Sequence, residues 1–270
     1  MSNDLTELEC TLIESLPKPP TLAAVRLTNI WIIEWLSPGE RKTGNELHQW
    51  MKQKRHGWSI YNPCTSKNEV IRSIAHAADL ASQSGVVPVL HIEAHRGPEG
   101  LAPSRDAEGE LLHWTELTIP LQKLNTATNC NLILVVVTCF GFAAIQALTQ
   151  GLRAPAVALI GPNATVNESD LFLGAKELYR RFMDKNPELT CIAESASREM
   201  RTSNFEIEPF AMLAYEALVE QLVRETRPDE HQACLERLRQ CMHQQTAFST
   251  NTEQVCERIV PNLFTFLYVV

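Results

Sequence analysis

The chain has 270 residues, of which 44% are hydrophobic and 21% charged, a balance typical of globular proteins and not of disordered ones. The net charge of -8 argues against nucleic acid or an anionic membrane surface as the main partner. No apolar run reaches the roughly 18 residues that a membrane-spanning helix needs, and the N-terminus lacks the pattern of a signal peptide. Eight scattered cysteines without a CxxC pair favour free thiols, so we expect a cytoplasmic protein without a metal site.

The first part of the chain reads as an extension followed by strands and helices in alternation. The expected order is an N-terminal extension over 1–24, a buried strand over 29–36, a short helix over 45–55, a strand over 58–62 and a helix ending near 85. Ser66 and Glu69 predict the start of that last helix, because the two side chains of a capping box satisfy free backbone N–H groups.

The middle of the chain continues the alternation. The expected order is a strand over 86–92, a polar loop over 96–110, a helix over 114–124, a strand over 132–138, a helix over 142–152, a strand over 156–160, and a helix capped by Asn167 or Ser169 and ending near 183. Pro120 must lie in the first turn of its helix or break it, because proline lacks a backbone N–H. Strands that are apolar almost throughout predict an α/β fold with a mostly parallel sheet covered by helices on both faces.

Beyond residue 183 the sequence is mostly helical. Helices are expected over 187–200, 209–225, 230–244 and 252–260, and the apolar last residues are expected to form a strand or a tail on the core. We therefore divide the chain into an extension (1–24), an α/β core (25–200) and a mainly helical C-terminal part packed on that core (201–270).

Two chemically active side chains follow two of the predicted strands. His95 comes after VVPVLHI and Cys139 after LILVVVT. The carboxyl ends of parallel strands meet at one edge of a sheet, so on neighbouring strands, about 4.8 Å apart, the two side chains would emerge side by side. An imidazole there can deprotonate the thiol and protonate a leaving amine. Gly141 permits a tight strand-to-helix turn that exposes the sulfur and points backbone N–H groups at an oxyanion.

Each residue also has a purely structural interpretation. A cysteine at the end of an apolar strand is usually a small core residue, and a strand histidine is usually a satisfied core or surface residue. What favours catalysis is the pairing, with a glycine within two residues of each. His91 is the rival histidine, and we expect it to pack within the sheet or to form a hydrogen bond. His91 and His95 would lie about 13 Å apart on a strand, which disfavours a shared metal ion.

The strings HIEAHRGPEGL and LVVVTCFG resemble the two signature blocks of the caspase-like (clan CD) cysteine peptidases, and of their bacterial CHAT-type domains in particular. In that family an apolar strand ends in His-Gly and the next apolar strand ends in Cys, often with a glycine just beyond. The stretches ELLHWTELTIPLQKLN and 154–183 resemble the family's intervening helix and its next strand and helix. The similarity covers roughly residues 25–200.

The resemblance implies a three-layer caspase-like fold and a cysteine endopeptidase without a cofactor. His95 would be the general base and acid, Cys139 the nucleophile, and backbone N–H groups at Cys139 and just after the histidine would form the oxyanion hole. Here Arg96 stands where the family keeps a glycine, so Gly97 would take over through a one-residue bulge, or the hole would be weakened. The alternative is therefore a weak or inactive caspase-like module that binds a partner protein.

The resemblance also implies a protein substrate, such as a gasdermin-like or toxin-like partner, in a bacterial defence or cell-death system. A third hypothesis, a nucleotide-binding α/β protein, is disfavoured because the sequence contains neither GxGxxG nor GxxxxGK[ST]. The preference at the cleavage site stays open. An acidic preference would need an arginine-lined pocket and a basic one an acidic pocket, and the loop over 96–110 could supply either.

Overall fold

The computed structural model describes residues 28–86, 88–104, 110–148, 154–183, 189–200, 205–210 and 213. The chain divides into two compact units, one over 24–210 and one formed by the two ends of the chain, 1–23 and 211–270. All that follows concerns the unit over 24–210. The predicted extension, the last strand or tail, and nearly all of the three helices predicted beyond residue 208 lie outside the described residues.

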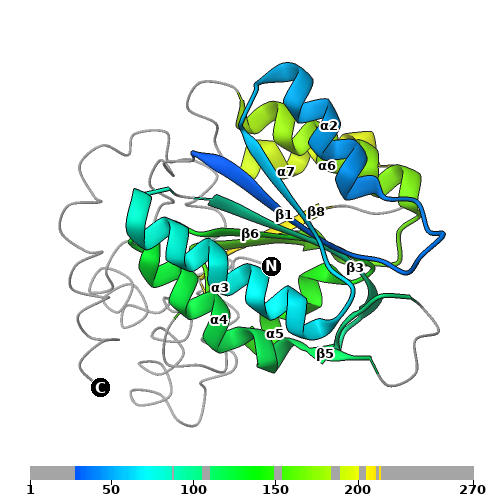
Figure 1. Ribbon diagram of the computed structural model, residues 1–270. Coiled ribbons are helices and arrows are strands. Elements are labelled where there is room, and N and C mark those ends of the chain that lie inside the picture. Colours follow the sequence, from blue (N-terminus) through cyan, green and yellow to red (C-terminus); the bar gives the residue numbers. More distant parts are fainter. Residues whose placement is uncertain are drawn as a thin grey trace, which may run out of the picture. The chain divides into compact units, whose positions relative to one another are not determined.

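The middle layer of this unit is a sheet with the strand order β2-β1-β3-β6-β7-β8 (Figure 1). Its strands are β1 (Asn29–Trp35), β2 (Ser59–Pro63), β3 (Pro88–Gly97), β6 (Ile133–Val137), β7 (Ala158–Pro162) and β8 (Phe205–Pro209), and a hairpin extends from β3 through β4 (Gly100–Ala102) and β5 (Leu112–His113). The first five strands of that order pair in parallel, and β8 is antiparallel to β7. The prediction of a mostly parallel sheet is confirmed.

Helices cover both faces of the sheet (Figure 1). One face carries α2 (Thr43–Lys54), α6 (Glu168–Phe182) and α7 (Leu189–Glu199), and the other carries α3 (Lys67–Ser84), α4 (Trp114–Ala127) and α5 (Ala144–Leu148). Every residue of β6 and β7 is buried, which explains why these strands are apolar on both faces. The predicted three-layer α/β architecture is therefore confirmed.

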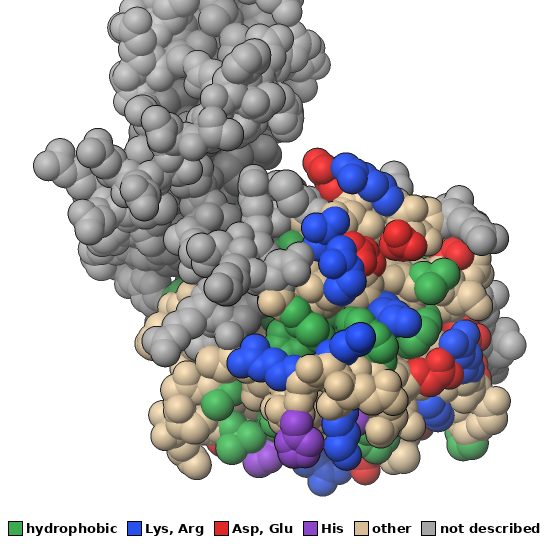
Figure 2. Space-filling model, turned by 90° about the horizontal axis from the view of Figure 1, so that it is seen from above, with side chains coloured by type: hydrophobic (Ala, Val, Ile, Leu, Met, Phe, Trp, Pro, Cys, Tyr) green, Lys and Arg blue, Asp and Glu red, His purple; other side chains and the backbone are tan. Residues whose placement is uncertain are grey.

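The outer surface over α2, α6 and α7 is mixed in character. Seen from that side, Lys and Arg side chains are interspersed with acidic and hydrophobic ones (Figure 2). No helix in the described part of the chain is both long and apolar enough to cross a membrane.

Helix ends follow the predicted capping residues. The hydroxyl of Ser66 accepts a hydrogen bond from the N–H of Glu69 (3.4 Å), and Gly85 ends α3 with a positive φ of 65°. The Glu69 carboxylate turns to the N–H and hydroxyl of Thr65 (2.6 and 2.8 Å) instead of closing the capping box on Ser66. Of the two candidate caps of α6, Asn167 is the one used, and it accepts from the N–H of Asp170 (2.8 Å).

Other expectations are corrected. Helix α4 runs through Pro120, because three leucines buried on one side of α4 (Leu117, Leu121 and Leu124) hold it against the fold. β3 continues past His95 into a hairpin, so the segment predicted as a loop from residue 96 begins as a strand. The helix predicted over 142–152 starts as a 3-10 turn, η1 (Gly141–Ala143), followed by α5. The sequence analysis missed β8, which lies beyond residue 200.

Candidate active site

The register of β3 and β6 places His95 and Cys139 at the same level of the sheet edge. The two strands are parallel neighbours, as predicted, and Glu93 pairs with Val137. His95 and Cys139 each lie two residues beyond that pair. Both line a cavity of about 310 Å³ and a second one of about 520 Å³. The structure thus brings together the two residues that the sequence analysis selected.

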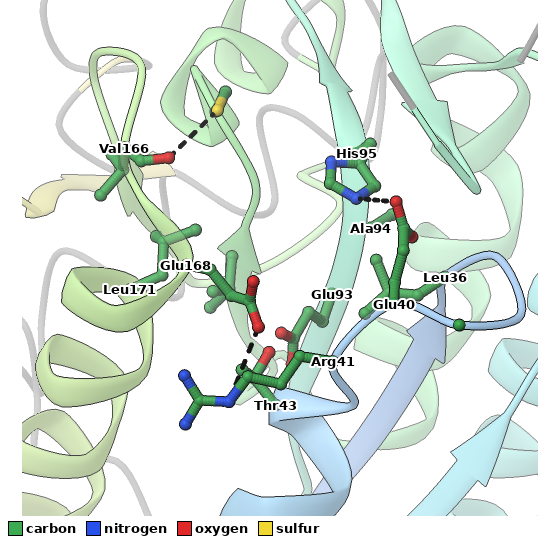
Figure 3. A pocket seen from close by; sticks show the side chains of 13 residues that line it. Leu36, Glu40, Arg41, Thr43, Glu93, Ala94, His95, Val166, Glu168 and Leu171 are labelled. Atoms are coloured by element: carbon green, nitrogen blue, oxygen red, sulfur yellow. Dashed lines mark hydrogen bonds and ion pairs between the residues drawn. The ribbon is translucent and has the colours of Figure 1, made fainter. Parts of the chain in front are cut away.

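His95 is held by a residue that the sequence analysis missed. Its Nε2 lies 3.0 Å from Oε1 of Glu40, and Figure 3 shows the carboxylate facing the imidazole. Glu40 belongs to the turn after β1, and β1 pairs in parallel with β3, which brings that turn to the same edge. A ring N–H at Nε2 donates to the carboxylate, so Nδ1 is the nitrogen that can accept a proton.

The signal for Glu40 was present in the sequence but ambiguous. An acidic residue in the turn after a strand is expected at the carboxyl edge if that strand lies next to the one bearing His95. Glu34 and Glu46 also flank this turn, and the tertiary contact with His95 is what distinguishes Glu40 from them.

Cys139 begins the tight turn after β6. Its thiol donates a long hydrogen bond (3.6 Å) to the carbonyl of Val166, the contact drawn at Val166 in Figure 3. Phe140 has a positive φ of 55°, which is uncommon for a non-glycine residue. The N–H of Phe140 donates to Ala164 (3.1 Å) and that of Gly141 donates to Thr138 (3.0 Å). Backbone hydrogen bonds therefore fix the turn and occupy both of these N–H groups.

Gly141 serves the close packing of this turn on the sheet. A Cβ at Gly141 would lie 2.4 Å from the carbonyl oxygen of Val136, a distance that no side chain tolerates. A Cβ at Gly161 of β7 would likewise lie 2.9 Å from the backbone nitrogen of Phe142. Two glycines thus let the turn that carries Cys139 pack directly against β6 and β7.

The segment after His95 is a regular hairpin. His95, Arg96 and Gly97 pair one for one with Ala102, Leu101 and Gly100, so the one-residue bulge, one of the two alternatives considered for Gly97, does not form. Gly97 lines the second cavity, and a Cβ there would meet only the ring of Phe140, at 3.9 Å. The side chain of Arg96 lies outside the described residues, so its predicted place in the groove stays a prediction.

His91 is a core residue, as expected. It is fully buried, and its Nδ1 lies 2.8 Å from the hydroxyl of Tyr179 on α6. Burial lowers the pKa of His91 to about 3, so the ring is neutral. Its contact with α6 places it in the interior, away from the sheet edge that bears His95.

Glu93 lies between His91 and His95 on β3, and its buried carboxyl group lines the first cavity. Its side chain is 9% exposed. Burial raises the pKa of Glu93 well above its usual range, and the neighbouring carboxylates of Glu34 and Glu168 raise it further. Glu34 has partners of its own, because it accepts from the N–H of Gly44 (2.7 Å) and from the hydroxyl of Tyr61.

No protein-family model matches the chain, and no curated protein matches it. Among solved structures, a secreted C11 cysteine protease from Bacteroides thetaiotaomicron, in complex with an irreversible peptide inhibitor, is similar with a TM-score of 0.48. The two share 9% identity over 74% of this chain and 70% of that chain. A likeness of this degree assigns the chain neither a family nor an activity.

Within the described residues, no group of three or more His, Cys, Asp or Glu side chains could hold a metal ion.

Proposed function

We propose that the protein is a caspase-like cysteine endopeptidase in which Cys139 is the nucleophile and His95 the general base and acid. The observation that carries the proposal is the shared level of the two residues on neighbouring parallel strands, where both line the same two cavities. The order of the two residues along the chain, histidine before cysteine, and the sheet with helices on both faces agree with what the resemblance implies.

The chemistry begins with the thiol turning from Val166 toward His95. That motion gives up one weak, long hydrogen bond. Nδ1 of His95 accepts the thiol proton, and the thiolate attacks the scissile carbonyl, forming the S–C bond while the carbonyl π electrons move to oxygen. Collapse of this intermediate expels the amine, which takes the proton from His95. Water, deprotonated by His95, then hydrolyses the thioester and restores the thiol.

Glu40 would act on His95 and not on the substrate. Its carboxylate fixes the orientation of the ring and stabilises the imidazolium that forms when the thiol is deprotonated. We call it a positioning residue for that reason.

A weak or inactive caspase-like module that binds a partner protein is the second candidate. The observation that favours it is the hydrogen bond from the thiol to Val166, together with Arg96 in place of a glycine. The two cavities would then hold a peptide segment without cutting it. A gasdermin-like or toxin-like partner and a defence role rest on the resemblance alone in either case, and a cytoplasmic location rests on the cysteine pattern and the N-terminal sequence.

Alkylation by iodoacetamide near neutral pH, followed by peptide mapping, tests the proposal. Cys139 should react at least about tenfold faster than Cys64, which is buried and whose pKa burial raises to about 11. His95→Ala should remove that advantage, while His56→Ala, in the exposed turn before β2, should retain it. Equal rates for the two cysteines, or a rate that His95→Ala leaves unchanged, would exclude the dyad.

Digestion of a peptide library then separates the two candidates. The endopeptidase should produce cleavage products that the Cys139→Ala protein does not produce. A protein whose Cys139 reacts in a His95-dependent way but that cuts no peptide would instead support the binding module.

A further inference from the structure

The first cavity beside Cys139 and His95 combines apolar walls with carboxyl groups. Its apolar lining includes Leu36, Val137, Val166 and Leu171. Three carboxyl groups line it. Glu40 faces His95, and the other two come from Glu93 on β3 and Glu168 at the start of α6, which Figure 3 shows between the strand and the helix. A side chain with an aliphatic stem and a polar end matches this distribution. The volume of about 310 Å³ is at the lower end of the range for pockets that hold small ligands.

Glu93 forms no hydrogen bond with a described residue, and the group beside it is the neutral ring of His91. The side chain of Glu93 is 9% exposed. The polar atom recorded beside it is Nε2 of His91, at 3.6 Å, which is itself buried and without a hydrogen-bond partner in the described structure. The Glu93 carboxyl group lines the cavity, so a ligand there that donates hydrogen bonds would meet it.

The other charged groups that line the cavity are already engaged. Glu40 is paired with His95. Arg41 donates two hydrogen bonds to Glu46 (2.8 and 2.7 Å) and lies over the ring of Phe172, while its Nε is 3.6 Å from Glu168. Arg41 is therefore poorly placed to receive a substrate carboxylate, and it neutralises Glu168 only in part.

The remaining field at Glu93 is negative. Burial and the charges of Glu34, Glu168 and Glu46 oppose its ionisation, and Arg41 offsets them in part. A cation would relieve this repulsion and satisfy the unpaired carboxyl group at the same time, whereas an anion would add to the repulsion and a neutral apolar side chain would leave the carboxyl group unpaired.

We propose that this cavity receives the side chain of the substrate residue whose carbonyl Cys139 attacks, and that Glu93 and Glu168 select lysine or arginine there. The aliphatic stem of that residue would cover the apolar walls, and its ammonium or guanidinium group would donate hydrogen bonds to the two carboxyl groups. The inference rests on the proposed peptidase and names its substrate class: proteins cut after a basic residue. It also places the selectivity on β3 and α6 and not on the loop over 96–110.

Three tripeptide chloromethyl ketones that differ only in the residue next to the reactive group test this selection. In each reaction the Cys139 thiolate forms an S–CH2 bond and chloride leaves. The reacting position carries lysine, norleucine (a similar stem without the charge) or aspartate, and intact-mass spectrometry gives the rate of adduct formation on Cys139. The lysine reagent should react at least about tenfold faster than the other two.

Isosteric variants test which carboxyl groups select the basic side chain. Glu168→Gln and Glu93→Gln should each reduce the ratio of the lysine rate to the norleucine rate at least about tenfold. Glu194→Gln, which removes the same charge from an exposed position on α7, should retain the full advantage. Glu168 is half exposed, so its variant carries the test if Glu93→Gln fails to fold.

Each outcome separates this inference from the proposed function. Equal rates with lysine and norleucine, or the fastest rate with aspartate, overturn the basic selection and leave Cys139 as a nucleophile. Reaction with iodoacetamide that depends on His95, but with none of the three reagents, also overturns the selection. Loss of the His95-dependent reaction with iodoacetamide overturns the proposed function, and the inference with it.

Discussion

The carboxylate of Glu40 lies 3.0 Å from Nε2 of His95, and this contact joins the turn after β1 to β3 at the candidate active site. It fixes which ring nitrogen remains free to accept a proton. The site thus consists of a cysteine and a histidine that follow or lie on neighbouring strands. Glu40, from the turn after β1 on the other side of β3, is the third residue.

Replacing Glu40 tests its role as a positioning residue. Glu40→Gln should slow both the alkylation of Cys139 and the cleavage of peptides about tenfold, because the amide cannot stabilise the imidazolium by charge. Glu40→Asp should recover part of the rate, and the thermal midpoint should change little in either variant because the side chain is one-third exposed. Rates that are unchanged in Glu40→Gln, or an equal loss in Glu40→Asp, would contradict this role.

Alanine substitutions at Gly141 and at Gly97 should differ strongly in how much they destabilise the protein. Gly141→Ala should destabilise the protein by about 2–4 kcal/mol, because its Cβ would lie 2.4 Å from a backbone oxygen in a packed turn. Gly97→Ala should change stability by no more than about 0.5 kcal/mol, because its Cβ meets only a side chain, at 3.9 Å. Urea denaturation measures both. Similar losses in the two variants would mean that the turn is not packed as described.

We predict that Glu93 makes the protein less stable as the pH rises above about 4.3. Its folded-state pKa is raised above that of the unfolded chain, about 4.3, so the folded protein holds a proton that the unfolded chain releases. The stabilisation is full below that value and is lost as the pH rises through the folded-state pKa. Relative to Glu93→Gln, the unmodified protein should lose up to about 1.4 kcal/mol per pH unit in this window. A difference that does not depend on pH would refute the assignment.

For His91 we predict the opposite pH dependence of stability, a loss of stability as the pH falls. Its pKa is lowered to about 3 in the folded protein, whereas it is about 6.5 in the unfolded chain. The neutral ring is therefore fully stabilising above about pH 6.5, and this contribution is lost as the pH falls toward the folded-state pKa. Denaturation curves of His91→Gln should lack this acid-side loss. Parallel curves for the variant and the unmodified protein would show that His91 does not titrate in this way.

Local patterns were sufficient for most of the elements. The apolar run of β6 and the ends of α3 at Ser66 and Gly85 could be read from adjacent residues, because burial of both strand faces and helix capping act over a few positions. β8 was missed because a short edge strand with Glu206 and Glu208 has little apolar signal and is defined by its pairing with β7. Helix α4 continues through Pro120 because packing outweighs the local propensity.

The sequence by itself determined that the chain alternates apolar strands with helices, and that His95 and Cys139 each follow one of the strands. The tertiary structure alone decided that Glu40 reaches His95, that the thiol lies against Val166, and that Glu93 ends unpaired in a cavity beside them. The physical reason is that strand order and register depend on packing between segments far apart in the chain. A register shift of one residue would turn Glu93 away from the cavity and separate the two residues proposed for catalysis.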